Sequence, residues 1–97
     1  MNIQSMLQQA QKMQKDMEKI KKEIEEKIYV CEKSFVKVET KGTKELLKIS
    51  INIDKIDKED IEMLEDIIIV AVNENNKKID DDMKTKMGKF GHLAGLM

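Results

Sequence analysis

The chain of 97 residues contains no proline and no arginine, and it has a single cysteine. Without proline nothing interrupts a long helix from within, because proline removes a helical hydrogen bond and clashes with the preceding turn. With Cys31 as the lone thiol, neither an internal disulfide nor a cysteine-based metal site can form. All 18 basic residues are lysines, which lack the planar fork with which arginine reads guanine edges. Any nucleic-acid contact is therefore expected to fall on phosphates.

Aromatic residues and long apolar runs are also scarce. Tyr29, Phe35 and Phe90 are the aromatic residues, and eight methionines suit narrow helical seams better than a thick core. The longest apolar run, residues 67–72, is far too short to cross a bilayer, and the polar N-terminus does not resemble a signal peptide. We expect a cytoplasmic protein with one domain, residues 1–97, which gains stability by pairing with a second copy.

The first quarter of the chain has the heptad pattern of a coiled coil. Two apolar series recur every seven positions: Ile3, Ala10, Met17 and Ile24, and Met6, Met13 and Ile20. The intervening residues are mainly Gln, Lys and Glu, which favour helices. The pattern predicts one long helix over residues 2–27 with an interhelical seam.

A period of two follows and predicts strands with one buried face near residues 28–32, 35–40 and 46–53. The last two strands should form a hairpin through a turn at residues 40–43, where Gly42 is free to take a positive φ.

Helical spacing returns near the C-terminus. Asp57 is a credible N-cap, and apolar residues recur with helical spacing from Leu64 onward. Residues 67–72 also suit a buried strand, but the pattern on both sides favours helix. Three glycines are expected to stop this helix and leave a flexible tail from about residue 88: Gly88, Gly91 and Gly95. The order helix, three-strand antiparallel sheet, helix is an α+β layout.

Charge is distributed unevenly, although the net charge is only -1. Residues 1–22 carry five lysines and two acidic residues, and residues 75–97 carry five lysines and three acidic residues. Residues 54–74 carry two lysines and eight acidic residues. If both helices leave the sheet on the same side, the basic ends meet at one pole and the acidic segment lies at the other. A positive pole of this kind attracts polyanions.

Four lysines of the first helix lie three, four and three residues apart: Lys12, Lys15, Lys19 and Lys22. This spacing places them in one stripe opposite the apolar seam. The stripe has two readings, a solvated outer face of a coiled coil or a ridge that contacts phosphates with salt-sensitive affinity.

No residue pattern indicates catalysis or a cofactor. The lone His92 lies among glycines in the predicted tail, and Cys31 has no histidine near it in the sequence. The residues of the Asp80–Asp82 run point in different directions on a helix, so they cannot jointly bind one cation. We therefore predict a protein that is not an enzyme and that binds no metal, cofactor, small-molecule substrate or membrane.

Two stretches carry a family resemblance. Residues 8–17, QQAQKMQKDM, and residues 62–73, EMLEDIIIVAVN, together with the strand end INID at 51–54, resemble the YbaB/EbfC family of bacterial nucleoid-associated proteins. The resemblance implies an α/β fold, a tweezer-like homodimer, and low-specificity binding of duplex DNA through protruding helices. Carried onto this chain, it points to seven lysines: Lys12, Lys15, Lys19, Lys22, Lys84, Lys86 and Lys89.

Two other functions stay open at this point. A helix–hairpin–helix chain with coiled-coil helices also resembles prefoldin subunits, and the Met-rich seam of this chain would then hold client segments. A structural adaptor of a replication or recombination complex is the other alternative.

Overall fold

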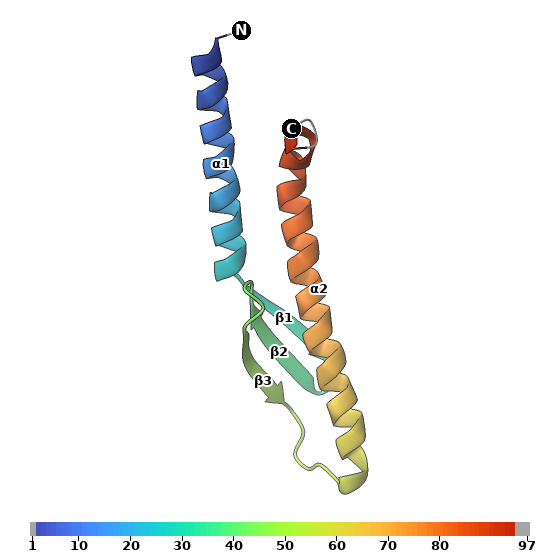
Figure 1. Ribbon diagram of the computed structural model, residues 1–97. Coiled ribbons are helices and arrows are strands. Elements are labelled where there is room, and N and C mark those ends of the chain that lie inside the picture. The colour runs from blue at the N-terminus through green and yellow to red at the C-terminus, as the bar shows by residue number, and fades with distance from the viewer. Residues whose placement is uncertain (1, 95–97) are drawn as a thin grey trace.

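The computed structural model describes the backbone of residues 2–94 and the side chains of residues 2–88. Its elements are helix α1 (Ile3–Glu26), strands β1 (Ile28–Lys33), β2 (Val36–Lys41) and β3 (Leu46–Ile51), a 3-10 turn η1 (Lys58–Asp60) and helix α2 (Ile61–Ala94). The described molecule is elongated, with extents of 70 × 21 × 14 Å (Figure 1). The predicted α+β layout is confirmed. In the described residues, no helix combines the length and apolarity that a membrane span requires.

Residues at both ends of helix α1 determine where it begins and where it ends. The side chain of Asn2 accepts a hydrogen bond from the Gln4 N–H at 3.0 Å, which satisfies one of the free donors of the first turn. Lys27 is extended, so α1 ends there and β1 begins at the next residue. Only the C-terminal part of α1 packs against α2, through Ile20 and Ile24. The rest of α1 protrudes beyond the sheet (Figure 1).

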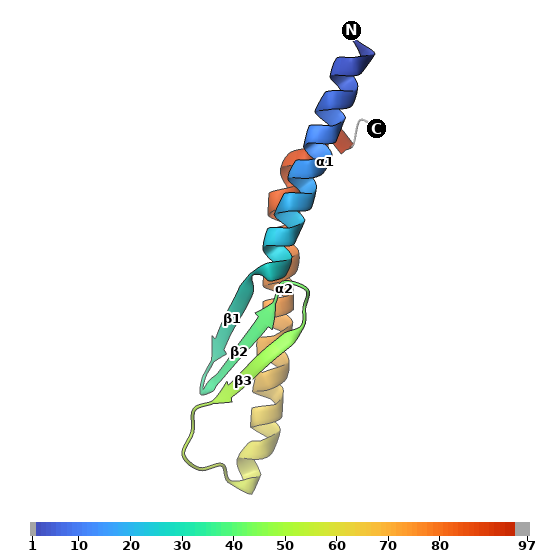
Figure 2. The ribbon, with the colours of Figure 1, turned by 90° about the vertical axis from the view of Figure 1, so that its left-hand side faces the viewer.

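The three strands form an antiparallel sheet in the order β1-β2-β3. Helix α2 covers one face of the sheet over β1 and β2 (Figure 2). On that face Cys31, Val36 and Val38 are buried with Ala71 of α2. The register places Glu39 between Val30 and Lys48, and opposite charges on neighbouring strands stabilise a solvated face. The outer face of β1 leaves Ile28 and Val30 exposed.

Asn75 of α2 is fully buried against the sheet. Its side-chain amide N–H groups donate to the Tyr29 carbonyl at 3.0 Å, the Val38 carbonyl at 3.1 Å and the Thr40 hydroxyl at 3.2 Å. These acceptors belong to β1 and β2, so one side chain ties α2 to two strands.

Gly42 does not have the positive φ that its turn position suggested; in this turn the positive φ, 74°, belongs to Lys44. The need for glycine comes from a close approach, because a Cβ at Gly42 would lie 1.6 Å from the Ile24 carbonyl oxygen. The Gly42 N–H also donates to the Lys27 carbonyl at 2.9 Å. The β2–β3 turn is therefore packed directly against the end of α1.

Helix α2 continues through Gly88 and Gly91 to Ala94, so the prediction that glycines end it near residue 88 is wrong. Glycine in a helix costs about 1 kcal/mol relative to alanine, which good helix formers and the absence of proline can outweigh. Gly95 lies outside the described residues.

Gly42→Ala should lower the free energy of unfolding by about 2 kcal/mol or more, because the added methyl group overlaps the backbone of α1. Gly88→Ala is the matched control, since a Cβ there meets nothing within 4 Å. The control should raise the free energy by about 0.5–1 kcal/mol. Urea unfolding followed by circular dichroism measures both variants, and equal stability of the two would contradict the close-approach argument.

Candidate nucleic-acid interface

Both long helices leave the sheet in the same direction. Figures 1 and 2 place the N-terminus of α1 and the C-terminal end of α2 at one end of the molecule. The acidic segment of residues 54–74 lies toward the opposite end, where α2 begins. The predicted arrangement of one basic and one acidic pole is therefore confirmed, and charge is separated along the 70 Å axis of the molecule.

The four lysines of α1 that were predicted to form a stripe are all exposed. They lie on the side of α1 away from Ile20 and Ile24, which pack toward α2. Among residues 2–88, no ion pair within 4.0 Å involves any of these four side chains. The remaining lysine of α1, Lys21, pairs with Glu25 at 4.0 Å. The stripe is thus a row of exposed lysines without close ion pairs in the described residues, flanked on α1 by Asp16, Glu18, Glu23 and Glu25.

The lysines predicted on α2 differ from one another. Lys84 is exposed and forms no ion pair in the described part of the chain. Lys86 lies 3.6 Å from the Asp82 carboxylate. The Lys89 side chain lies outside the described residues. Lys86 consequently has a partner four residues earlier on the same helix, a spacing typical of helical ion pairs.

Asp82 links the three elements that meet where α1 leaves the sheet. Its carboxylate accepts a hydrogen bond from the Tyr29 hydroxyl at 2.5 Å and lies 3.6 Å from the Lys27 ammonium group. The Lys27 ammonium group also sits 4.9 Å from the centroid of the Tyr29 ring. Beside this cluster Ile24, Tyr29 and Ile79 are buried together. These contacts hold the base of α1 against α2.

The same contacts shift two pKa values in opposite directions. Burial, and then the hydrogen bond to Asp82, raise the pKa of Tyr29 to about 12. The Tyr29 hydrogen bond, assisted by the charges of Lys86 and Lys27, lowers the pKa of Asp82 below its ordinary value of 3.8. Asp82 is therefore ionised and Tyr29 is protonated at neutral pH.

Cys31 occupies a structural position. Its thiol donates to the Glu74 carboxylate at 3.0 Å, and burial followed by this hydrogen bond raises the pKa of Cys31. Glu74 also pairs with Lys33 at 3.0 Å, and Lys78 donates to the Val30 carbonyl at 2.8 Å. A thiol that stays protonated is a poor nucleophile. Lys78 also satisfies one backbone carbonyl of β1, an edge strand whose backbone groups would otherwise stay unpaired.

The acidic run on α2 diverges, as its helical spacing predicted. Asp80 pairs with Lys44 at 2.8 Å, whereas Asp82 faces Tyr29. Within the described residues, no group of three or more His, Cys, Asp or Glu side chains is placed to hold a metal ion.

An apolar surface remains uncovered beside β3. Ile49 lies opposite Val38 and Ile51 lies opposite Val36, so both face the same side of the sheet as α2. Because α2 covers β1 and β2, Ile49 and Ile51 stay 38% and 41% exposed. Further exposed apolar residues flank them in β3, in the following loop and at the start of α2: Leu47, Ile53, Ile56 and Ile61. We call these six residues the β3 surface.

The fold and the basic pole define a small α+β protein built to present charged helices. A family model described as the YbaB/EbfC DNA-binding family matches residues 1–94. The chain belongs to this family, which confirms the resemblance seen in the sequence. This family is described by DNA binding and not by a catalytic activity, in agreement with the predicted class of protein.

Individual bacterial relatives are similar along nearly the whole chain. A protein of Clostridium novyi (strain NT), named a nucleoid-associated protein, is 42% identical over 92 residues, which are 93% of this chain and 81% of the relative. A nucleoid-associated protein of Acetivibrio thermocellus is 38% identical over 98 residues, covering 98% of this chain and 87% of the relative. One from Mycoplasmopsis pulmonis is 43% identical over 84 residues, covering 87% of this chain and 84% of the relative.

Asp82→Asn should lower the free energy of unfolding at pH 7 by about 1 kcal/mol, because the charged acceptor of Tyr29 and Lys27 is lost. A lowered pKa stabilises the fold above the unfolded pKa, and this stabilisation disappears as the pH falls through the folded value. The loss of unfolding free energy in Asp82→Asn should therefore be complete at pH 5 and above and become smaller below about pH 4.

Asp81→Asn is the control, since Asp81 is exposed and forms no ion pair in the described residues. Urea titrations at pH 7, 5 and 3 compare the two variants with the wild type. An equal loss in both variants, or a deficit that does not change with pH, would contradict the assignment.

Proposed function

We propose that the protein is a homodimer that binds duplex DNA with little sequence preference through lysines on its protruding helices, in the cytoplasm at the nucleoid. The observation that carries the proposal is the stripe of four exposed lysines on α1 without ion pairs among the described residues. The names of the relatives and the family description support the same function. Lys84, Lys86 and Lys89 of α2 are proposed as secondary contacts.

The stripe suits a phosphate backbone. Lys12 and Lys22 are ten residues apart, which corresponds to about 15 Å along a helix. Lysines over that length reach phosphates of the duplex as point charges, while base edges are read mainly by arginine, asparagine and glutamine. The acidic pole keeps the other end of the molecule away from the DNA by repulsion. Binding is therefore electrostatic, salt-dependent and almost independent of sequence.

The second copy is proposed to pack on the β3 surface. Exposed isoleucines next to a hydrophobic core are unusual in a protein of this size, because a small domain depends on burying most of its apolar area. The surface lies beside α2 at the sheet end, away from the tips of the helices. Pairing there leaves the basic ends free and gives the dimer two pairs of arms. Two arms that engage one DNA molecule raise its apparent affinity by avidity.

A client-binding module of the prefoldin type is the second candidate. Its support is the exposed apolar tip of α1, formed by Ile3, Met6 and Leu7. Against it, the first half of α2 is packed on the sheet, so α2 protrudes for only part of its length. The DNA titration below separates the two candidates, because a client-binding module would leave DNA unbound.

The DNA titration uses fluorescence anisotropy of a labelled duplex at about 50 and 200 mM salt, with log affinity expected to fall by about 0.9 per log salt for each phosphate neutralised. The test variant replaces four lysines by glutamine: Lys12, Lys15, Lys19 and Lys22. It should bind at least about tenfold more weakly and with a smaller salt slope.

The matched control makes the same charge change away from the arms by replacing four other lysines with glutamine: Lys37, Lys41, Lys48 and Lys55. None of these forms an ion pair in the described residues. The control should keep its affinity within about threefold, since it alters only long-range attraction that salt screens. Equal losses of DNA affinity in both variants would mean that only the net charge matters. Absence of DNA binding by the wild type would refute the proposal.

Ile49→Asp tests the dimer. A buried, unpaired carboxylate at the interface should weaken dimerisation by at least about 100-fold. Val30→Asp is the control, because Val30 is 41% exposed against 38% for Ile49 but lies on the outer face of β1. Light scattering after size exclusion gives the masses, and circular dichroism checks folding. A monomeric wild type, or an Ile49→Asp protein that stays dimeric, would refute this interface.

A further inference from the structure

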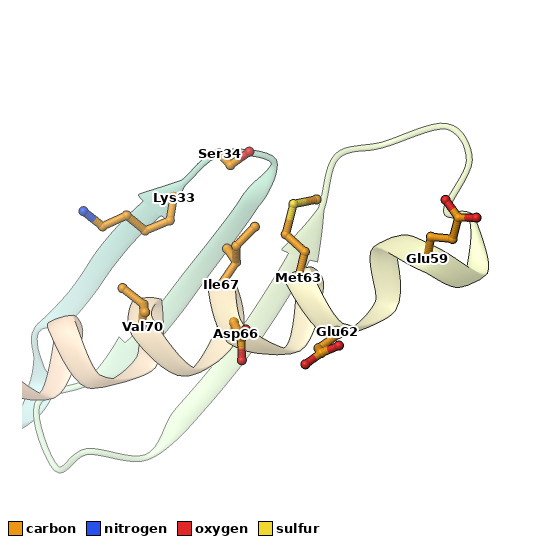
Figure 3. Close-up of a pocket in the computed structure, with 8 residues that line it drawn as sticks. All are labelled: Lys33, Ser34, Glu59, Glu62, Met63, Asp66, Ile67 and Val70. Carbon is orange, nitrogen blue, oxygen red and sulfur yellow. The ribbon is translucent and has the colours of Figure 1, made fainter.

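A groove at the acidic pole has no role in the proposed contact with DNA. It is about 650 Å³ in volume and lies between α2 and the β1–β2 turn (Figure 3). Met63, Ile67 and Val70 of α2 point toward Lys33 at the end of β1 and Ser34 of the turn, and they form an apolar floor. Glu59 belongs to η1, and Glu62 and Asp66 line the side of α2 away from the turn. We call these eight lining residues the acidic groove.

The charge of the acidic groove is not balanced within the protein. Among residues 2–88, Glu59, Glu62 and Asp66 form no ion pairs, and all three are exposed. The one lysine in the lining, Lys33, is already paired with Glu74 at 3.0 Å. The floor is also only partly covered, since Met63 and Val70 are 47% and 50% exposed. A segment that fits here must carry cations beside apolar side chains.

The first half of α1 has this chemistry. Ile3, Met6 and Leu7 are exposed at its tip, and Lys12 and Lys15 follow within two turns. Ile3, Leu7 and Lys15 are spaced by multiples of four, so they lie along one side of α1. A helix lying in the groove would place Ile3 and Leu7 on the floor and Lys15 against the carboxylates. The groove repels DNA, so its negative charge selects a cationic protein segment.

The contact must join two different molecules. The tip of α1 and the acidic groove lie at opposite ends of a molecule that is 70 Å long, so α1 cannot fold back into its own groove. The groove is lined from η1, α2 and the β1–β2 turn, whereas Leu47, Ile49 and Ile51 of the β3 surface lie on the strand farthest from β1. Pairing through these three strand residues therefore leaves the groove open.

We propose that the acidic groove of one dimer binds the lysine-bearing N-terminal half of α1 from another dimer. The contact joins unlike surfaces, head to tail, so it does not close on itself and extends into chains of dimers. The lysines of α1 make both contacts. Duplex DNA therefore competes with the acidic groove for these lysines, and the chains of dimers dissociate. The competition and the dimer as the associating unit rest on the proposed function, whereas the contact of the groove with α1 of another molecule does not.

Sedimentation velocity without DNA tests the contact, at protein concentrations from about 5 to 200 µM in about 50 mM salt and again in about 500 mM salt, where charges are screened beyond about 4 Å. For the wild type, the sedimentation coefficient should rise with concentration only at the lower salt. The groove variant should remain a dimer, with an association constant at least about tenfold lower. Its substitutions are Glu59→Gln, Glu62→Gln and Asp66→Asn.

The control variant makes the same charge change outside the groove, with Glu32→Gln, Glu45→Gln and Asp54→Asn. These three residues are exposed and form no ion pairs in the described part of the chain. This variant should associate like the wild type. A control that loses association equally, or a groove variant that keeps it, would overturn the proposal.

A mixing experiment separates the two sides of the contact. The groove variant keeps its arm lysines, and the variant with Lys12, Lys15, Lys19 and Lys22 changed to Gln keeps its groove. Each should stay dimeric alone, and the equimolar mixture should regain association. If the mixture does not associate although both proteins keep their helical circular dichroism spectra, the contact is refuted. The groove variant should bind DNA at least as tightly as the wild type, so failure here is distinguishable from failure of the DNA proposal.

Discussion

The position of α2 depends on one buried amide. Asn75 donates to acceptors on β1 and β2 from a site with no exposed surface. These bonds replace the ones that its amide nitrogen would make to water, while its Oδ1 has no hydrogen-bond partner among the described residues. They hold α2 at one height and one rotation relative to the sheet. Since α2 is continuous from Ile61 to Ala94, the same bonds also determine where its protruding half points.

The direction of α1 follows from a second set of contacts. Gly42 touches the end of α1 closely enough to exclude any side chain, and Asp82 holds Tyr29 and Lys27 beside it. Both constraints act at the base of α1, so the rest of that helix extends freely with its lysines outward. The protein thus uses its few buried residues to aim the helices and leaves the distal charges unpaired. A small domain has a limited core, and that core fixes the position only of the segments that pack in it.

The exposed surfaces also follow from the small size of the core. A single helix covers two of three strands, and the third keeps its apolar face exposed beside it. Acidic residues gather where α2 begins, a position that the helix dipole favours, and lysines gather toward the other end. Because of this separation of charge, the basic end attracts anions and the acidic end attracts cations. The proposed contacts use the basic ends, the β3 surface and the acidic groove, and the lysines of α1 are shared between DNA and the groove.

Local pattern alone determined a large part of this protein. The helix predicted over residues 2–27 is found at Ile3–Glu26, and the three strands begin within one residue of their predicted positions. Periodicity succeeds here because each element has one apolar face, which is buried in β1 and β2 and exposed in β3. The charge blocks predicted the two poles because both helices leave the sheet in the same direction. The lysine stripe needed only helical geometry, so it too was evident from spacing.

Tertiary structure decided what depends on residues far apart in the chain. Tyr29 meets Asp82 across 53 positions and Asn75 meets Val38 across 37, so no local pattern signals either contact. Gly42 resembled a residue needed for positive φ, but its lack of a side chain serves the approach of α1. Gly88 resembled a helix end, yet nothing near it forces the chain to turn. The sequence by itself set the elements and their charge because these are local properties, and packing decided their directions because direction depends on which distant groups share a buried site.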